Sequence, residues 1–160
     1  DLNFLTEHGI GSYEELLDRC EVASASAARL KADLRDTGAK IDELALKMKH
    51  VAAYRQLKPI YDRYKASRDK EKFLRGHESE IILFEAAARE CKRLGAVPLP
   101  ATERMQAEID ELNARKAILK AELQKAQRKE QDYAAMRQNV EDFLSPPQPE
   151  QERKKNVELE

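Results

Sequence analysis

Basic and aromatic residues are interleaved in the middle of the chain, in a pattern that could bind nucleic acid. Between Lys49 and Arg75 there are nine Lys or Arg residues and three acidic residues, in a chain whose net charge is −1. Lys and Arg can neutralise phosphates, and aromatic rings can stack on bases. This stretch is therefore a candidate DNA-contacting surface. Its aromatic residues are Tyr54, Tyr61, Tyr64 and Phe73.

The same aromatic residues have a second interpretation, as part of a helical core. Tyr54, Leu57, Tyr61 and Tyr64 recur at the spacing of one helical face, which is typical of buried side chains. The excess of positive charge remains under either interpretation. We expect DNA contacts from Arg63, Lys65, Arg68 and Lys72 first, and also from Lys58, Lys70 and Arg75.

Residue groups that could support catalysis or metal binding are sparse in this sequence. The three histidines are far apart, and His77 with Glu80 shares a helical face without a second group of ligands, so surface or capping roles are favoured. There is no glycine-rich phosphate loop and no Ser/His/Asp grouping with supporting turns. We expect no catalytic, cofactor or metal site, and hence no enzyme.

The two cysteines and the apolar residues favour a cytoplasmic protein. Cys20 and Cys91 each lie on an apolar helical face, at no metal-binding spacing, which predicts two buried and reduced thiols. No apolar run approaches the ~20 residues that a membrane-spanning helix needs. We therefore expect a cytoplasmic protein without a membrane span.

Two segments of the chain carry an apolar seam at alternating steps of four and three residues. Such sustained heptads are typical of a coiled coil. The sequence predicts an all-α fold, an elongated antiparallel coiled-coil hairpin of two long helices with a compact helical tip between them. The first segment has Leu16, Cys20, Ala23, Ala27, Leu30, Leu34, Thr37, Ile41, Leu44, Met48, Val51 and Arg55, and the second has Met105, Ile109, Leu112, Lys116, Leu119, Leu123, Ala126, Glu130, Tyr133, Arg137, Val140 and Leu144.

Aligned ends predict the register of the two long helices. Facing residues then have numbers that sum to 160, and a slip of one heptad is the main competing arrangement. This register pairs Leu16 with Leu144, Cys20 with Val140, Ala27 with Tyr133, Leu34 with Ala126, Ile41 with Leu119, Met48 with Leu112, and Val51 with Ile109.

Capping and helix-breaking residues predict the boundaries. Ser12 and Glu15 form a capping box with Ile10 as a hydrophobic staple, Pro59 ends or kinks the first long helix, and Gly95 ends the tip. Thr102 caps the second long helix. The expected segments are a short helical turn at 1–11, a helical hairpin at 12–145 (long helix 13–58, tip 59–95, linker 96–101, long helix 102–145), and a disordered tail at 146–160.

The ends of the sequence suggest a piece of a longer protein. The chain begins with Asp1, which predicts an internal or C-terminal fragment. The final Leu159-Glu160 is typical of a scar left by a cloning vector.

Several strings resemble relaxases, the mobilization nucleases of Gram-positive conjugative and mobilizable elements such as plasmids and transposons. The opening LNFLTEHGIGSYEEL, Leu2 to Leu16, resembles a stretch downstream of their nuclease domain. The likeness covers most of Leu2 to Leu144. Its further positions are Tyr54-Arg55, Tyr61, Tyr64, Lys72-Phe73, the string HESEIILFEAA from His77 to Ala87, and the pairs Leu94-Gly95 and Leu99-Pro100.

The resemblance implies an accessory role in DNA transfer. Relaxases nick one DNA strand with a tyrosine nucleophile and a metal held by a histidine cluster, both in their N-terminal domain. That cluster has no match here, so Tyr54, Tyr61 and Tyr64 are not expected to be nucleophiles. We expect a non-catalytic region that binds DNA weakly and non-specifically, or that docks accessory or transfer proteins along the coiled coil. The alternative is a structural or protein-interaction coiled coil that binds no DNA.

Overall fold

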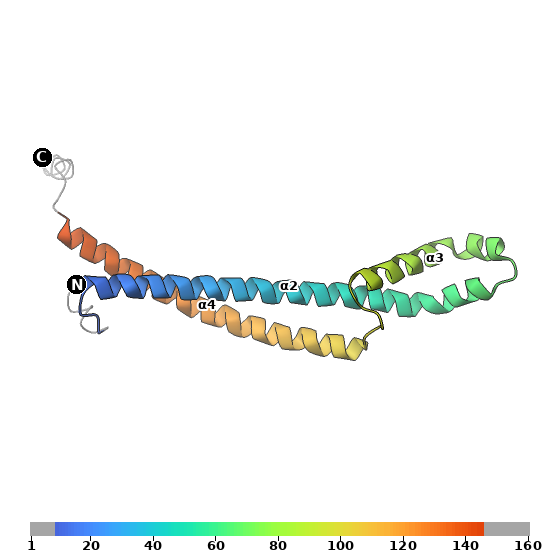
Figure 1. The fold of residues 1–160 in the computed structure, drawn as a ribbon, viewed down its shortest axis with the longest axis horizontal. Coiled ribbons are helices and arrows are strands. Elements are labelled where there is room, and N and C mark those ends of the chain that lie inside the picture. The colour runs from blue at the N-terminus through green and yellow to red at the C-terminus, as the bar shows by residue number, and fades with distance from the viewer. Residues whose placement is uncertain (1–8, 146–160) are drawn as a thin grey trace, which may run out of the picture. The chain divides into compact units, whose positions relative to one another are not determined.

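The computed structural model describes residues 9–145, and within that range the chain is all-α (Figure 1). Three helices, α2 (Tyr13–Ala66), α3 (Lys70–Arg93) and α4 (Thr102–Leu144), account for the regular structure, and no strand occurs among the described residues. The predicted fold class is confirmed at this level. The expected short helical turn at 1–11 and disordered tail at 146–160 lie almost wholly outside the described residues.

The chain divides into two units, and the two long helices contribute to both of them. Unit 1 comprises Asp1–Asp33 and Leu119–Glu160, and unit 2 comprises Leu34–Ile118. Each unit is described by itself below. This division differs from the single predicted hairpin of 12–145, because the contacts group at two places along the long helices.

The N-terminus of α2 forms as its sequence predicts. The Ser12 Oγ accepts a hydrogen bond from the Glu15 backbone N–H at 3.1 Å, which satisfies one of the unpaired donors at the helix start. The Glu15 carboxylate in turn accepts from the Gly11 N–H at 2.9 Å, one residue before the position expected for a capping box. Ile10 is buried in the same cluster as Leu16, so it staples the chain to the first turn of the helix.

Unit 1 is a pair of helical segments that run antiparallel. The Tyr13 hydroxyl donates to the Glu141 carboxylate at 2.9 Å, and the Cys20 thiol donates to the Tyr133 carbonyl at 3.4 Å. Residues of both segments form a small core between these two contacts. It contains Ile10, Leu16, Ala23, Tyr133 and Met136, with Tyr13, Cys20 and Val140 packed against it.

The predicted register is wrong in unit 1 by one heptad. Cys20 contacts Tyr133, whereas alignment of the helix ends placed it opposite Val140, seven residues further along. A slip of seven residues keeps seam positions opposite seam positions, so the heptad pattern itself does not oppose it. The capped start at Ser12 and the bond between Tyr13 and Glu141 hold the observed register.

Burial confirms most of the predicted seam, residue by residue. Leu16, Ala23, Val51 and Leu119 are buried, and Thr37 is buried as a polar member of the row. Eight of the 24 seam positions are buried and thirteen are half-buried; the exceptions are Arg55, Arg137 and Leu144, which are exposed. Near the end of α4 the row continues through Met136, which is 4% exposed, in place of Arg137.

Unit 2 contains the α2–α3 turn, and here the predicted end of the first helix is wrong. The helix α2 passes through Pro59 and ends at Ala66. An interior proline removes one helical hydrogen bond and costs ~3 kcal/mol. Tyr54 before it and Tyr61 after it both pack on Phe84 of α3, at ring-centroid distances of 4.8 and 4.3 Å, and this packing stabilises the helix on both sides of the proline.

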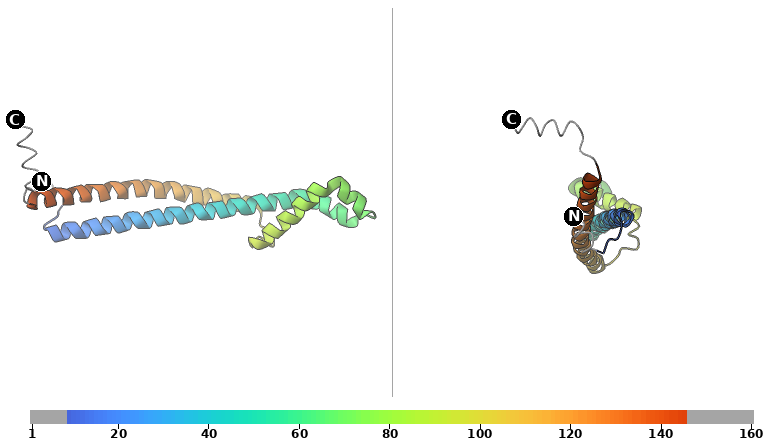
Figure 2. Two further views of the ribbon diagram at one scale, coloured as in Figure 1. Left: turned by 90° about the horizontal axis from the view of Figure 1, so that it is seen from above. Right: turned by 90° about the vertical axis from the view of Figure 1, so that its left-hand side faces the viewer.

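The helix α3 folds back along the C-terminal part of α2 (Figures 1 and 2). Asp69 caps its start by accepting from the Lys72 N–H at 3.1 Å. A kink at His77 (φ −135°, ψ 24°) interrupts the helix one residue after Gly76.

The end of α3 confirms the role predicted for Gly95. Gly95 has a positive φ of 71°, its N–H donates to the Lys92 carbonyl, and the Ala96 N–H donates to the Cys91 carbonyl. These two bonds form a Schellman motif, which needs a left-handed residue and therefore favours glycine. Ala96 and Cys91 are buried together with Val51 and Met105.

The helix α4 begins at Thr102, as the predicted bounds 102–145 require, and ends at Leu144. The Thr102 Oγ, which was predicted to cap this helix, accepts a hydrogen bond from Arg55 at 2.9 Å. Arg55 also donates to the Pro100 carbonyl at 2.7 Å. Arg55, which was predicted to lie in the seam, thus connects α2 to the linker and to the start of α4 through these hydrogen bonds.

Candidate nucleic-acid interface

Seven exposed cations surround the α2–α3 turn in unit 2, and we call them the basic surface. The last turns of α2 place three of them, the connection places one, and the first two turns of α3 place three. All seven residues predicted from the sequence as DNA contacts belong to this surface, and all are exposed. They are Lys58, Arg63, Lys65, Arg68, Lys70, Lys72 and Arg75.

One member of the basic surface is engaged in an ion pair. The Lys58 Nζ lies 2.9 Å from a carboxylate oxygen of Asp62, one helical turn later. The hydrogen bond to Asp62 raises the pKa of Lys58 above its usual value. Lys58 is therefore the member least able to contribute a new phosphate contact.

Two further members lie over aromatic rings. The Arg63 guanidinium carbon is 5.6 Å from the centre of the Phe73 ring, and the Lys65 Nζ is 5.3 Å from the centre of the Tyr61 ring. These distances are within the range of cation–π interactions. Sequence reasoning missed this role, although the i,i+4 spacing of Tyr61 and Lys65 on one helix could have indicated it.

The other four members form no ion pair with any residue in the range 9–145. They are Arg68, Lys70, Lys72 and Arg75. All four residues belong to the connection between α2 and α3 or to the first two turns of α3. Their charges are compensated mainly by solvent and counterions, which is the condition for releasing counterions to a polyanion.

The aromatic residues of this region pack against one another. Phe84 is buried and contacts Tyr54 and Tyr61, and Tyr64 lies 6.2 Å from Phe73 between ring centres. Phe73 also stacks on the His77 imidazole at 4.5 Å. The predicted rings Tyr54, Tyr61 and Tyr64 are half-buried and pack against one another or against Phe84, so the structure agrees with their interpretation as core only in part. The rings support the turn that carries the basic surface.

The histidine and cysteine residues make structural contacts. His77 Nδ1 lies 3.0 Å from the Glu80 carboxylate, which fits the local role expected for this pair. Cys91 is 1% exposed, and its burial raises the pKa of the thiol, which disfavours the reactive thiolate. Within residues 9–145, no three His, Cys, Asp or Glu side chains are grouped so that they could hold a metal ion.

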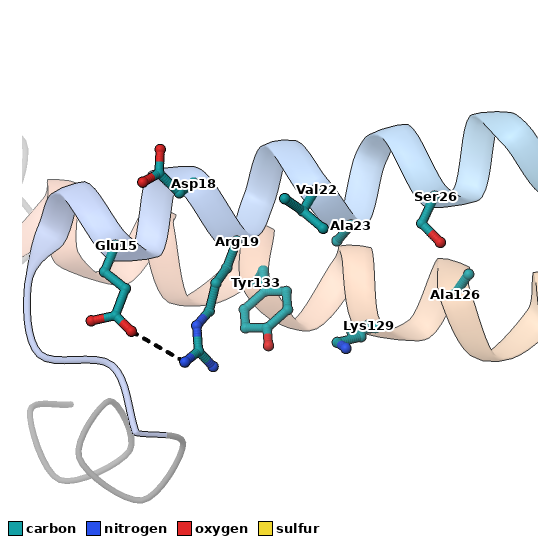
Figure 3. Close-up of a pocket in the computed structure, with 9 residues that line it drawn as sticks. All are labelled: Glu15, Asp18, Arg19, Val22, Ala23, Ser26, Ala126, Lys129 and Tyr133. Atoms are coloured by element: carbon teal, nitrogen blue, oxygen red, sulfur yellow. Dashed lines mark hydrogen bonds and ion pairs between the residues drawn. The ribbon is translucent and has the colours of Figure 1, made fainter.

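Unit 1 has a groove between its two helical segments, which Figure 3 shows in close-up. Its volume is about 350 Å³, and Ala23, Val22 and Tyr133 supply much of its lining. The Arg19 guanidinium in its wall is paired with Glu15 at 3.2 Å. The other cation of the lining, Lys129, has its Nζ 6.0 Å from the centre of the Tyr133 ring. Because Glu15 and Asp18 also line the groove, positive charge does not predominate there.

None of the described helices is long and apolar enough to cross a membrane. No protein-family model, curated protein or solved structure matches this chain. The class that the fold and surface define is an all-helical chain with a localised patch of uncompensated positive charge.

Proposed function

We propose that this chain is a non-catalytic accessory region of a relaxase, and that it contacts DNA through the basic surface. One observation carries the proposal. The stretch from Lys49 to Arg75 has nine basic and three acidic residues, and four exposed cations of the basic surface have neither a carboxylate nor an aromatic partner among the described residues. The resemblance to relaxases in the strings quoted above supplies the biological setting.

The charge arrangement favours non-specific binding. Each phosphate neutralised by Lys or Arg releases condensed counterions, so affinity is high at low salt and falls steeply as salt rises. The basic surface offers cations without a set of side chains placed to read base edges. A dissociation constant on the order of 10⁻⁴–10⁻⁶ M is typical of such binding.

The structure also supports coiled-coil packing within each unit. In unit 1, Leu16, Ala23 and Tyr133 of the predicted seam share one core, and in unit 2 Val51 and Met105 share another. We propose that these seam residues pack as knobs between neighbouring residues of the facing segment, as they do in coiled coils.

Docking of an accessory or transfer protein is a second candidate function, and a separate observation favours it. Ile82 and Leu83 are adjacent on α3 and are 53% and 58% exposed. Apolar side chains grouped on a surface are a feature of protein-binding sites. Under this second function the chain would bind a protein partner and no DNA.

A fluorescence-anisotropy titration with labelled origin-of-transfer DNA at about 50 mM salt tests the proposed function. We expect saturable binding that weakens as salt is added. A flat curve for both single- and double-stranded DNA would remove the DNA-binding function and favour the protein-docking one. Substitution of Ile82 and Leu83 by Gln is the matched control for this titration, and it should leave DNA binding unchanged.

A further inference from the structure

Building on the proposed function, we infer that the basic surface binds the phosphates of duplex DNA in preference to single strands, and that it recognises no bases. The inference rests on the contacts of the aromatic rings beneath the surface and on the positions of the cations above them. It specifies the kind of nucleic acid that the surface fits.

Single-stranded DNA is bound largely by stacking of bases on aromatic rings, at ~1–3 kcal/mol per base. The rings of this region are occupied by other side chains. Phe84 is 5% exposed and lies against Tyr54 and Tyr61, and Phe73 is stacked on His77. A base that stacked on Phe73 or Phe84 would have to displace one of these ring contacts, and half-buried Tyr64 has tilted ring contacts only, at 6.0 Å from Tyr61 and 6.2 Å from Phe73.

The cations restrict access to the rings further. Lys65 lies over the Tyr61 ring and Arg63 lies over the Phe73 ring. A base approaching either of these covered ring faces would displace a favourable cation–π contact. The basic surface therefore presents charge to a ligand and offers it little aromatic area.

Binding that depends on charge alone favours the form of DNA, duplex or single-stranded, that has the higher charge density. Duplex DNA carries one charge per ~1.7 Å of its axis, and the dependence of log K on log salt is about −0.9 per phosphate contact, compared with about −0.7 for single strands. If duplex and single strand bind equally at about 1 M salt, four contacts, one each for Arg68, Lys70, Lys72 and Arg75, make duplex binding about tenfold tighter at 50 mM salt.

The same arithmetic gives the expected salt dependence. Four contacts to a duplex predict a slope of about −3.6, so raising the salt from 50 to 200 mM should weaken binding about 150-fold. The four cations that set this number are Arg68, Lys70, Lys72 and Arg75. Their backbone positions lie in the connection and the first turns of α3.

The test uses the whole chain and four labelled DNAs of about 20 nucleotides or base pairs: two duplexes of different sequence, oligo-dA and oligo-dT. We expect both duplexes to bind equally, about tenfold more tightly than either single strand, and the two single strands to bind within about twofold of each other.

Two results would overturn the inference while leaving the proposed function standing. One is equal or tighter binding of a single strand, and the other is a marked preference for one homopolymer, because both would require stacking on bases. Absence of binding to all four DNAs would instead overturn the proposed function, and the inference with it.

Discussion

Unit 1 and the basic surface of unit 2 differ in the balance of their charged residues. Over its whole length, unit 1 contains eleven basic and sixteen acidic residues, and two of its arginines, Arg19 and Arg137, pair with carboxylates one helical turn away. The basic surface gathers seven exposed cations around one turn, of which Lys58 alone has an ion pair among the described residues. Negative charge therefore predominates in unit 1, whereas the α2–α3 turn offers a local excess of positive charge to an external polyanion.

The two units also differ in how they build a core. Unit 1 buries Tyr133 among small and aliphatic side chains and Met136, whereas unit 2 has a cluster of aromatic rings in contact between α2 and α3. Aromatic side chains bury a large area each, so truncation of one ring should cost more than truncation of one aliphatic residue. The following predictions test these differences in order of decreasing effect.

Replacement of Phe84 by Ala should have the largest effect on stability. Phe84 is 5% exposed and contacts both Tyr54 and Tyr61. Truncation of a buried Phe typically costs about 3–5 kcal/mol. Urea unfolding followed by circular dichroism measures the loss. A cost no larger than that of an aliphatic truncation in unit 1 would contradict the difference between the two cores.

Leu119→Ala should cost on the order of 2–4 kcal/mol, because Leu119 is 5% exposed and belongs to the predicted seam. The adjacent Ile118 is 60% exposed and provides a matched control, for which Ala should cost less than about 0.5 kcal/mol. Both variants are measured by urea unfolding with an unchanged slope. Equal losses for the two variants would show that the seam does not face the core.

Ser12→Ala should cost about 1 kcal/mol, because it removes the hydroxyl that accepts the Glu15 N–H. The loss is measured as a lower melting temperature of the whole chain. Ser12→Asn preserves an acceptor at the cap and should retain most of the stability. An unchanged melting temperature for Ser12→Ala would mean that α2 starts without a stabilising cap.

The smallest of these contributions to stability is that of the Glu141 carboxylate, and lowering the pH should remove it. The hydrogen bond from Arg137, together with that from Tyr13, lowers the pKa of Glu141 below its usual value. A lowered folded-state pKa gives stability that is present above the ordinary pKa and is lost as the pH falls through the folded-state value. Glu141→Gln should therefore destabilise the chain at pH 7, with a difference from the unmodified chain that shrinks below about pH 4. A difference that stays constant with pH would exclude a role for the carboxylate charge.

The sequence contained enough information to predict which residues are buried in the seam, because burial repeats with the heptad. It could not predict the register, since a slip of seven residues, as at Cys20 and Tyr133, again aligns seam with seam. The choice depends on particular contacts between distant residues, such as that of Tyr13 with Glu141.

Helix boundaries and side-chain roles were predictable where the cause is local. The caps at Ser12 and Gly95 follow from short-range chemistry, and both formed. Pro59 has a local preference to end a helix, but rings that lie far apart in the sequence pack around it and the helix continues. The cation–π contact between Arg63 and Phe73 likewise spans the turn between two helices, so a residue pattern along one helix does not contain it.

The most direct test removes equal charge from the two contrasting regions. One variant changes Arg68, Lys70, Lys72 and Arg75 to Gln, and the other changes four exposed cations of unit 1, Lys31, Lys120, Lys125 and Arg128, to Gln. Both variants have the same net charge, and circular dichroism verifies that each keeps its helical content.

Duplex binding at 50 mM salt then separates a local surface from a general charge effect. We predict that the first variant loses affinity by at least about 100-fold, with the salt slope reduced by about 3.6, and that the second stays within about threefold of the unmodified chain. Equal losses in the two variants would contradict a DNA-binding surface localised at the α2–α3 turn.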